Sequence, residues 1–428
     1  MESFLTFFAF VIFFVVIFLI INERHIKISP EIALLGLSLV IGVICKMLLS
    51  SGVQLPVDGA IYNLTNLKID EILIDGMLCF MLFSGASDLK FKVLKKNFRP
   101  ITLLALLTTA ITTVIYGSLY YVLLSALKLG PNYINCLLLG AVISPTDPIA
   151  ATGILNKLGL SDELVSIIEG ESLFNDGTGV ALFVFIKGLS THTGEAGFFA
   201  IMAKEILGAI IIAALVSFLC LKLIKLTKND ITHIACSLLA VTMCYSWSER
   251  LGCSGVISSV VCGIIFATVM EKYREQGIVM SGGYYDDFWE TIDKLLNYVL
   301  YILIGLAFIF VVKIKMLVFA VVSATVLNFV ARYIGVFISS LFMKEVPGGY
   351  SKNQFATLMT WSGLKGGLCL ALMMSLYNVV TLREYNGMMI AVFATILFTT
   401  IVQGLTVSKL YLKLEKKKKS KMEGKDGN

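Results

Sequence analysis

Residues 140–150 read GAVISPTDPIA, an apolar run that two prolines interrupt three residues apart. Pro145 and Pro148 each lack the N–H group that an α-helix needs, and each pushes the residue before it out of the helical conformation. A helix that enters this run should therefore open at Thr146 and Asp147 and begin again after the second proline. The stretch predicts a helix that is broken in its middle, with main-chain polar groups and a carboxylate at the break.

The rest of the chain is strongly apolar. Of its 428 residues, 57% are hydrophobic and 15% are charged, whereas an average soluble domain has about half and about a quarter. The apolar residues come in blocks of about 18 to 25, a length that crosses a bilayer core of about 30 Å. We therefore expect an all-α polytopic membrane protein with no cofactor. A soluble enzyme, a nucleic-acid-binding module and a secreted disulfide scaffold are excluded.

Apolar runs separated by charged residues, glycine or proline predict about thirteen transmembrane helices. Lys and Arg collect on the cytoplasmic side of such proteins, and most of the 35 basic residues lie on the side of the C-terminal tail. With an odd number of spans, this places the C-terminus in the cytoplasm and the N-terminus outside. The expected spans lie near residues 3–21, 31–49, 70–87, 100–127, 133–155, 162–187, 198–225, 231–249, 254–271, 294–312, 315–342, 353–378 and 385–411.

Three ionisable residues fall near the middle of their spans, where the bilayer is most apolar. Asp147 lies in the fifth span, Asp176 in the sixth and Lys365 in the twelfth. A charge at that depth costs at least about 2.5 kcal/mol on insertion scales. Such residues should face the protein interior and be either paired or functional.

A second interruption surrounds Lys365, where residues 361–367 read WSGLKGG. Three glycines weaken this helix at the depth of the break around Asp147, and the two spans run in opposite directions. Two broken, crossing helices at the midplane are typical of transporters built from inverted repeats. The alternative is that proline and glycine merely kink two packed helices, which explains neither the matched depth nor the charges.

The sixth span carries the densest polar cluster, EGESLFNDGTG at residues 169–179. In a helix, Glu171 and Asn175 lie one turn apart, as do Ser172 and Asp176, so the four side chains share one broad face. Monovalent cations prefer oxygen ligands, which this face and the opened turn of the fifth span can supply together.

A carboxylate on this face can exchange one ion for another. Burial disfavours its charged form, so Asp176 can hold either a proton or a cation, which is the minimal chemistry of an antiporter. The alternative is that Asp176 and Glu171 are structural partners of Lys365 and Arg332.

Four motifs resemble the monovalent cation:proton antiporter family of the NhaP and NHE type, and their order and spacing match over almost the whole chain. The resemblance implies thirteen helices with a dimerisation bundle and a six-helix core, sodium/proton exchange by alternating access, and a homodimer. The motifs are GAVISPTDPIA (140–150), EGESLFNDGTGVALF (169–183), SERLGCSGVISSVVCGI (248–264) and WSGLKGGLCLAL (361–372).

The resemblance also implies roles for single residues. By motif position, Asp176 would carry the ion and the proton, with Asn175 as its neutral neighbour. Ser172 would supply a hydroxyl ligand to sodium and Thr146 a main-chain ligand, while Asp147 would bind or orient the ion at the crossing. Because only one member of the Asn175–Asp176 pair ionises, one cation for one proton is the simplest cycle, and we expect electroneutral exchange.

Two positions depart from the family pattern. Lys365 replaces the usual arginine of the twelfth span, and a lysine cannot form the planar two-pronged bridge to a carboxylate. The implied pairing of Glu171 with the twelfth span is therefore weaker here, and Arg332 of the eleventh span is the other candidate partner. A further acidic ligand is expected at the end of the third span in some relatives; Asp88 is the nearest candidate, although it lies at the cytoplasmic end.

These patterns together predict a secondary antiporter of the cell membrane, not an enzyme, that exchanges sodium or lithium for protons. Potassium/proton exchange at the same site is the first alternative, and a cation channel is a less favoured one. The predicted transmembrane domain covers residues 1–412, with core helices near 100–187 and 315–411 and the remaining helices at the dimer interface. Residues 413–428 form a charged cytoplasmic tail, expected to be disordered, whose lysines contact anionic lipid headgroups.

Overall fold

The computed structural model describes residues 2–50, 76–88, 96–156, 158–190, 198–278, 284–306, 314–377 and 379–426. Within these residues every regular element is a helix, and the β contacts amount to one isolated bridge. The chain divides into two compact units. The first comprises Met1–Leu67, Asn97–Gly179 and Tyr298–Asn428, and the second comprises Lys68–Lys96 and Val180–Asn297.

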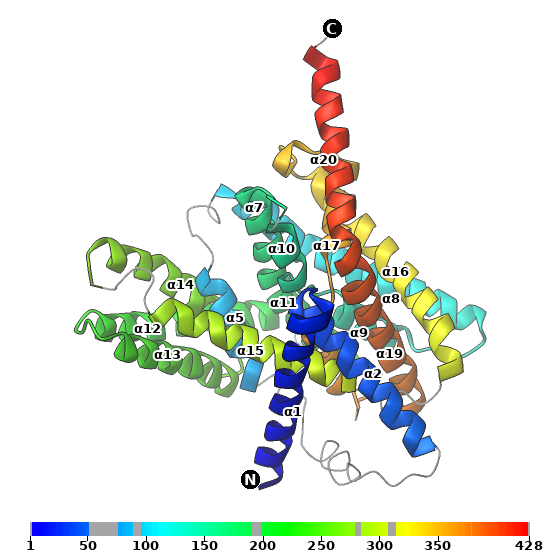
Figure 1. Cartoon of the computed structure of the whole chain (residues 1–428), viewed down its shortest axis with the longest axis horizontal. Helices are drawn as coiled ribbons and strands as arrows, with labels where there is room; N and C mark the ends of the chain where they lie inside the picture. Colours follow the sequence, from blue (N-terminus) through cyan, green and yellow to red (C-terminus); the bar gives the residue numbers. More distant parts are fainter. Residues whose placement is uncertain are drawn as a thin grey trace. The chain divides into compact units, whose positions relative to one another are not determined.

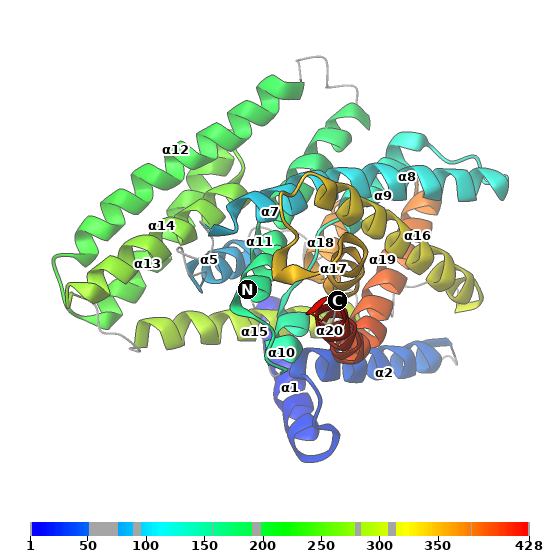
Figure 2. The same ribbon diagram turned by 90° about the horizontal axis from the view of Figure 1, so that it is seen from above.

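The first unit contains most of the residues that the sequence singles out. Its boundaries with the second unit fall within α11 and α15. Most of its α-helices are labelled in Figure 1, and α18 is labelled in Figure 2. The helices are α1 (Glu2–Ile21), η1 (Asn22–Ile26), α2 (Pro30–Ser50), α7 (Phe98–Thr102), η3 (Leu103–Thr108), α8 (Thr109–Ala126), α9 (Tyr133–Ile143), α10 (Ile149–Asn156), the start of α11 (Asp162–Ser190), the end of α15 (Tyr284–Leu306), α16 (Ile314–Leu341), η5 (Pro347–Gly349), α17 (Lys352–Ser362), α18 (Gly367–Met374), α19 (Leu382–Leu397), η6 (Phe398–Gln403) and α20 (Gly404–Asp426).

The second unit is a bundle around an aromatic core. The Phe83 ring lies 5.3 Å from the Phe266 ring and 4.5 Å from the Trp289 ring, measured between centroids. The Trp289 indole N–H donates to the Ser237 hydroxyl at 3.0 Å, so its one polar atom is satisfied. The helices are α5 (Leu78–Asp88), the end of α11, α12 (Phe198–Ile224), α13 (Asp230–Arg250), α14 (Gly255–Glu275) and the start of α15.

The helices are those of a multi-pass membrane protein, as predicted. Eight helices of the described chain are long and apolar enough to cross a bilayer, and shorter apolar helices include Tyr133–Ile143, half of a broken span. The all-α prediction is confirmed, while the number of thirteen spans stays a prediction. The span expected near residues 294–312 begins earlier, since α15 starts at Tyr284. Acidic residues in its first turn, Asp286 and Asp287, favour a helix start there.

The tail after residue 412 differs from the prediction of disorder, because α20 continues as a helix to Asp426. Part of the reason lies in the loop before α17. The Tyr350 hydroxyl donates to the Glu415 carboxylate, and the Lys418 ammonium lies 4.9 Å from the centre of the Tyr350 ring. These contacts stabilise α20 near Glu415 and Lys418. The lysines of this segment also have a high intrinsic helix propensity.

Two glycines let α8 and α9 pack main chain against main chain, and Figure 2 shows these helices side by side. A Cβ atom on Gly117 would lie 2.8 Å from the Cys136 carbonyl oxygen, and one on Gly140 would overlap the Thr113 carbonyl oxygen. Small residues at such a contact allow the close approach that drives helix association in membranes. The contact fixes the helix that leads into the proline break.

Replacing Gly140 by alanine should therefore destabilise the protein. The added methyl group must displace main-chain atoms, which costs about 1–3 kcal/mol. Gly36→Ala in α2 is the matched control, because a Cβ there meets nothing within 4 Å. We expect thermal unfolding in detergent at a lower temperature for Gly140→Ala alone; equal melting temperatures for the two variants would contradict the close packing of α8 on α9.

Candidate functional site

Two broken helices cross in the first unit. The first is α9, which ends at Ile143 and resumes as α10 at Ile149; the second is α17, which ends at Ser362 and resumes as α18 at Gly367. At the crossing the Asp147 N–H group donates to the Leu364 carbonyl at 2.9 Å, which forms an isolated antiparallel bridge. The predicted pair of broken, crossing helices is confirmed.

The open end of α9 is occupied by the Lys365 ammonium. Its Nζ atom donates to the carbonyl oxygens of Ser144 at 3.1 Å and Pro145 at 3.0 Å. The last carbonyls of a helix lack partners and carry a partial negative charge, so a buried cation is stabilised there. The main chain of Lys365 is held in turn, since its N–H donates to the Thr399 hydroxyl at 3.1 Å and its carbonyl accepts from Thr400 at 3.4 Å.

Asp147 lies beside the start of α18. A Cβ atom on Gly366, the N-cap of α18, would come within 2.6 Å of Asp147 Oδ2, so glycine allows the carboxylate to approach the positive end of the helix. The Tyr301 hydroxyl, from the end of α15, donates to the same oxygen at 2.8 Å. Asp147 is therefore oriented by a helix end and a phenol.

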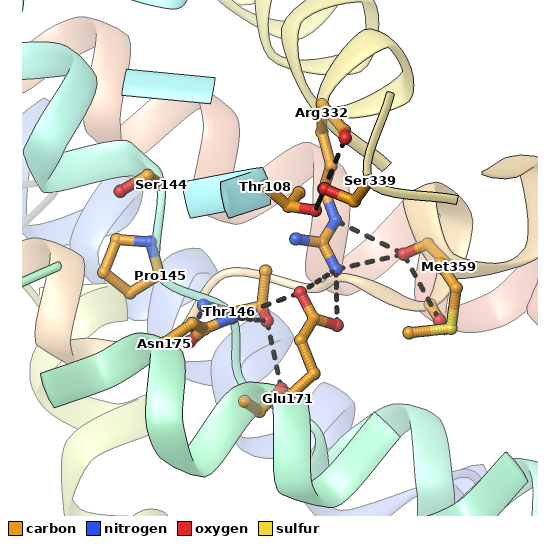
Figure 3. Close-up of polar contacts among 12 residues, drawn as sticks. Thr108, Ser144, Pro145, Thr146, Glu171, Asn175, Arg332, Ser339 and Met359 are labelled. Atoms are coloured by element: carbon orange, nitrogen blue, oxygen red, sulfur yellow. Dashed lines mark hydrogen bonds and ion pairs between the residues drawn. The ribbon is translucent and has the colours of Figure 1, made fainter. Parts of the chain in front are cut away.

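A hydrogen-bonded network joins the break of the first helix to α11 (Figure 3). Asn175 Oδ1 accepts from the Thr146 N–H at 3.2 Å, while its Nδ2 donates to Thr146 Oγ1 at 2.8 Å and to Glu171 Oε1 at 3.3 Å. The hydroxyls of Thr146 and Ser172 lie 3.0 Å apart. The Asn175 amide thus uses both of its ends to hold the opened chain.

Glu171 pairs with Arg332 and not with Lys365. Both Glu171 carboxylate oxygens lie 3.0 Å from Arg332 Nη2, and the two residues are only 1% and 2% exposed. The Arg332 guanidinium also donates to the Met359 carbonyl in the last turn of α17, at 3.1 Å from Nη2 (Figure 3). The implied pairing of Glu171 with the twelfth span is therefore wrong. The rigid fork of arginine reaches a carboxylate and a carbonyl together, whereas the lysine is engaged at α9.

The packing of α16 positions the Arg332 side chain beside Glu171 and the Met359 carbonyl. The hydroxyls of Thr108 and Ser339 lie 2.8 Å apart and tie η3 to α16 (Figure 3). Gly335 lies close to the same threonine, and a Cβ atom on Gly363 would overlap the guanidinium itself. Gly363 therefore has two roles: it opens the helix, and it leaves room for the Arg332 guanidinium.

Asp176 differs from its neighbours, because its carboxylate makes no hydrogen bond and no ion pair with the described residues. The charged groups that act on it are Asp147, Lys365 and Glu171. One turn further, a Cβ atom on Gly179 would overlap the Pro145 ring, so α11 packs directly on the break. An acid without a protein partner thus lies against the crossing.

The role of the other expected ligand, Asp88, stays a prediction. Asp88 ends α5, in the second unit, and its side chain lies outside the described part. In the described chain no three His, Cys, Asp or Glu residues gather as a metal cluster. A cation at the crossing would be held by a carboxylate together with hydroxyl and main-chain oxygens.

Sequence reasoning missed the partners that come from distant helices. Tyr301, Thr399 and the Met359 carbonyl all contact site residues, but none lies in a motif. A tyrosine in an apolar span and a threonine near a helix end have ordinary structural explanations. No signal in the single sequence distinguishes them.

The model of the family described as "Sodium/hydrogen exchanger, transmembrane" matches residues 10–413. The chain belongs to this family. It is 29% identical over 397 residues to the Na(+)/H(+) antiporter NhaP of Pseudomonas aeruginosa, a match that covers 91% of this chain and 92% of the relative. It is 28% identical to the Na(+)/H(+) antiporter NhaH of Halobacillus aidingensis, over 89% of this chain and 96% of that one.

A solved structure has the same fold. The sodium proton antiporter MjNhaP1 of Methanocaldococcus jannaschii at pH 8 superimposes with a TM-score of 0.76 at 20% identity, over 96% of this chain and 99% of that chain. The resemblance inferred from the motifs is confirmed, and the protein is a transporter, not an enzyme.

The buried pair of Glu171 and Arg332 should be sensitive to the loss of one partner. Arg332→Met leaves a buried carboxylate uncompensated, which costs about 3–5 kcal/mol. The double variant with Glu171→Met should lose much less than the sum of the two single variants. Thermal unfolding measures all three, with Arg250→Met, at an exposed arginine, as the control. Additive losses would show that the two side chains do not interact.

Proposed function

We propose that the protein exchanges sodium, or lithium, for protons across the cell membrane, with the cation and the proton competing for Asp176. The names of the relatives support sodium/proton exchange. The observation that carries the proposal is the contrast between Asp176 and the groups around it. Glu171 is neutralised by Arg332 and Lys365 binds two carbonyls, while Asp176 has no bonded partner among the described residues.

The oxygen ligands for a cation come from the network around Asp176. Ser172 supplies a hydroxyl, Thr146 a main-chain carbonyl, and Asp147 binds or orients the ion from the crossing. The Ser172 oxygen already lies 3.0 Å from the Thr146 hydroxyl. A hydroxyl oxygen has two lone pairs, so it can keep that contact and still coordinate a cation.

Asn175 limits the stoichiometry of the cycle. Its amide is used at both ends, by Thr146 and by Glu171, and an amide does not carry a proton. Glu171 is held in an ion pair by Arg332. Asp147 accepts from the Tyr301 hydroxyl and lies at the start of α18, which leaves it to orient the ion. Asp176 is then the carboxylate that binds one cation or one proton, and exchange is electroneutral.

The remaining features follow from the charge distribution and the family resemblance. The C-terminus lies in the cytoplasm and the N-terminus outside, and the α20 lysines meet anionic lipid headgroups. The working form is a homodimer that operates by alternating access. The transport core consists of the helices near residues 100–187 and 315–411, which include the crossing, and the remaining helices form the dimer interface.

Asp176→Asn should abolish sodium-driven proton movement in everted membrane vesicles, because an amide neither binds a proton nor neutralises a cation. The matched control is Asp162→Asn, an exposed acid at the start of the same helix, which should keep the activity of the native protein. Sodium, lithium and potassium are added in turn to rank the ions. Retained ion-driven proton flux in Asp176→Asn would disprove the proposed role of Asp176. Ion flux without proton counterflow would identify a channel.

Electroneutral exchange predicts that the membrane potential leaves the equilibrium unchanged. Moving one net charge per cycle would couple transport to the potential by about 2.3 kcal/mol per 100 mV, roughly fiftyfold in the ion ratio. Proteoliposomes clamped at different potentials should reach the same sodium ratio at a fixed pH difference. A ratio that follows the clamped potential would disprove one-for-one exchange.

A further inference from the structure

The Asp147 carboxylate is held by a side chain from α15, a helix outside the predicted core near residues 100–187 and 315–411. The Tyr301 hydroxyl donates to Asp147 Oδ2 at 2.8 Å. The Tyr301 side chain is completely buried, so bulk water does not reach its hydroxyl. A buried hydroxyl without a partner is costly, and the Asp147 carboxylate is the partner that the fold provides.

Close packing on α18 brings α15 to the crossing. Leu300, the residue before Tyr301, lies against the start of α18, where a Cβ atom on Gly367 would overlap its side chain. The preceding glycine, Gly366, leaves space for the carboxylate itself, since a Cβ atom there would lie 2.6 Å from Asp147 Oδ2. Two successive glycines thus let α15 and the carboxylate approach the same helix end.

A second contact holds α15 on α2. A Cβ atom on Gly305, one turn after Tyr301, would overlap the Ser38 hydroxyl of α2. This hydroxyl lies 3.0 Å from the Leu35 carbonyl oxygen and 3.4 Å from the Tyr301 carbonyl oxygen, and Ser38 is completely buried. The place of the phenol therefore depends on close packing against both α2 and α18.

A phenol is suited to a carboxylate that must also meet a cation. The tyrosine hydroxyl is an uncharged donor, so it orients Asp147 without supplying a counter-charge. A lysine or arginine in its place would compete with the ion for the carboxylate. Hydrogen bonds to ionised acceptors are also about twice as strong as those between neutral groups. Tyr301 can therefore fix the direction of the Asp147 carboxylate and leave its charge for the ion.

A ligand that is fixed before the ion arrives binds it more tightly. A carboxylate that can rotate must lose this freedom when it binds a cation, and the loss reduces the affinity. The main chain of Asp147 is already held at the crossing, where its N–H donates to the Leu364 carbonyl at 2.9 Å. The bond from Tyr301 extends this order to the side chain, so the residue is preorganised as a ligand.

We propose that Tyr301 is a positioning residue of the ion site, whose hydroxyl fixes the Asp147 carboxylate and thereby sets the affinity for sodium. This inference rests on the role proposed above for Asp147. It also extends the site beyond the core helices, because α15 supplies the group that determines how tightly the crossing binds its ion.

Calorimetric titration of the purified protein with sodium tests the role of Tyr301. Tyr301→Phe keeps the ring and removes the hydroxyl, and the loss of one hydrogen bond to a charged group should weaken sodium binding about tenfold. In everted vesicles the same variant should raise the KM for sodium by a similar factor and leave kcat unchanged, as expected when binding alone is lost. Tyr284→Phe, at an exposed tyrosine of the same helix, should match the native protein.

A packing variant separates positioning from stability. Ile304 is also buried in α15, and Ile304→Ala should lower the melting temperature by leaving a cavity while the sodium affinity stays native. The role of Tyr301 would be overturned if Tyr301→Phe bound sodium with native affinity, if it lowered kcat alone, or if Ile304→Ala weakened sodium binding to the same extent.

The titration also separates this inference from the exchange mechanism. Full exchange by Asp176→Asn would disprove the proposed function, while the sodium affinities of the native protein and Tyr301→Phe would still decide the role of Tyr301. Native sodium affinity in Tyr301→Phe, together with an inactive Asp176→Asn, would overturn the role of Tyr301 alone.

Discussion

The hydrogen bond from the Asp147 N–H to the Leu364 carbonyl joins two helices that are open at the same point. An open helix inside a membrane exposes main-chain groups that lipid cannot satisfy. Each break is therefore tolerated because the other break, and a few side chains around it, supplies partners. Pro145 and Pro148 open one helix, and the glycines on either side of Lys365 open the other.

The same constraint explains where the buried charges lie. Two helices that stop at the crossing, α9 and α17, present the negative ends of their dipoles, and each meets a cation. Lys365 binds the carbonyls beyond α9, and Arg332 binds the Met359 carbonyl of α17. The positive end of α18 meets the Asp147 carboxylate. These residues first serve the broken fold, and the ion site is built on that arrangement.

The helical class, the two breaks and the polar face of α11 could all be predicted, because each depends on local chemistry. Proline and glycine interrupt helices wherever they stand, and the one-turn spacing of Glu171 and Asn175 is a property of any helix. The partner of Glu171 could not be decided in this way. Lys365 and Arg332 were both basic and both buried, and the choice depends on which carbonyls each side chain reaches across helices far apart in the sequence.

The start of α15 and the helical tail were missed for a related reason. The α20 lysines suggest a solvated chain until the Tyr350 hydroxyl, from a loop distant in the sequence, binds Glu415. Asp88 was proposed only because it is the acid nearest to the end of the third span, and its role stays a prediction. Tertiary partners, not propensity, decide such places.

On the proposed function, the isolation of Asp176 is itself what couples the two ions. A charged carboxylate with no partner is costly near the bilayer centre, at least about 2.5 kcal/mol, and either a proton or a cation removes that cost. The empty, charged site is therefore the least favourable form to carry past an apolar barrier, while both loaded forms are neutral. A protein partner for Asp176 would neutralise the empty form as well and allow it to reorient, which would uncouple the cation from the proton. Coupled exchange therefore requires that the basic residues at the crossing leave Asp176 unpaired. Arg332 instead binds Glu171, and Lys365 binds two main-chain carbonyls.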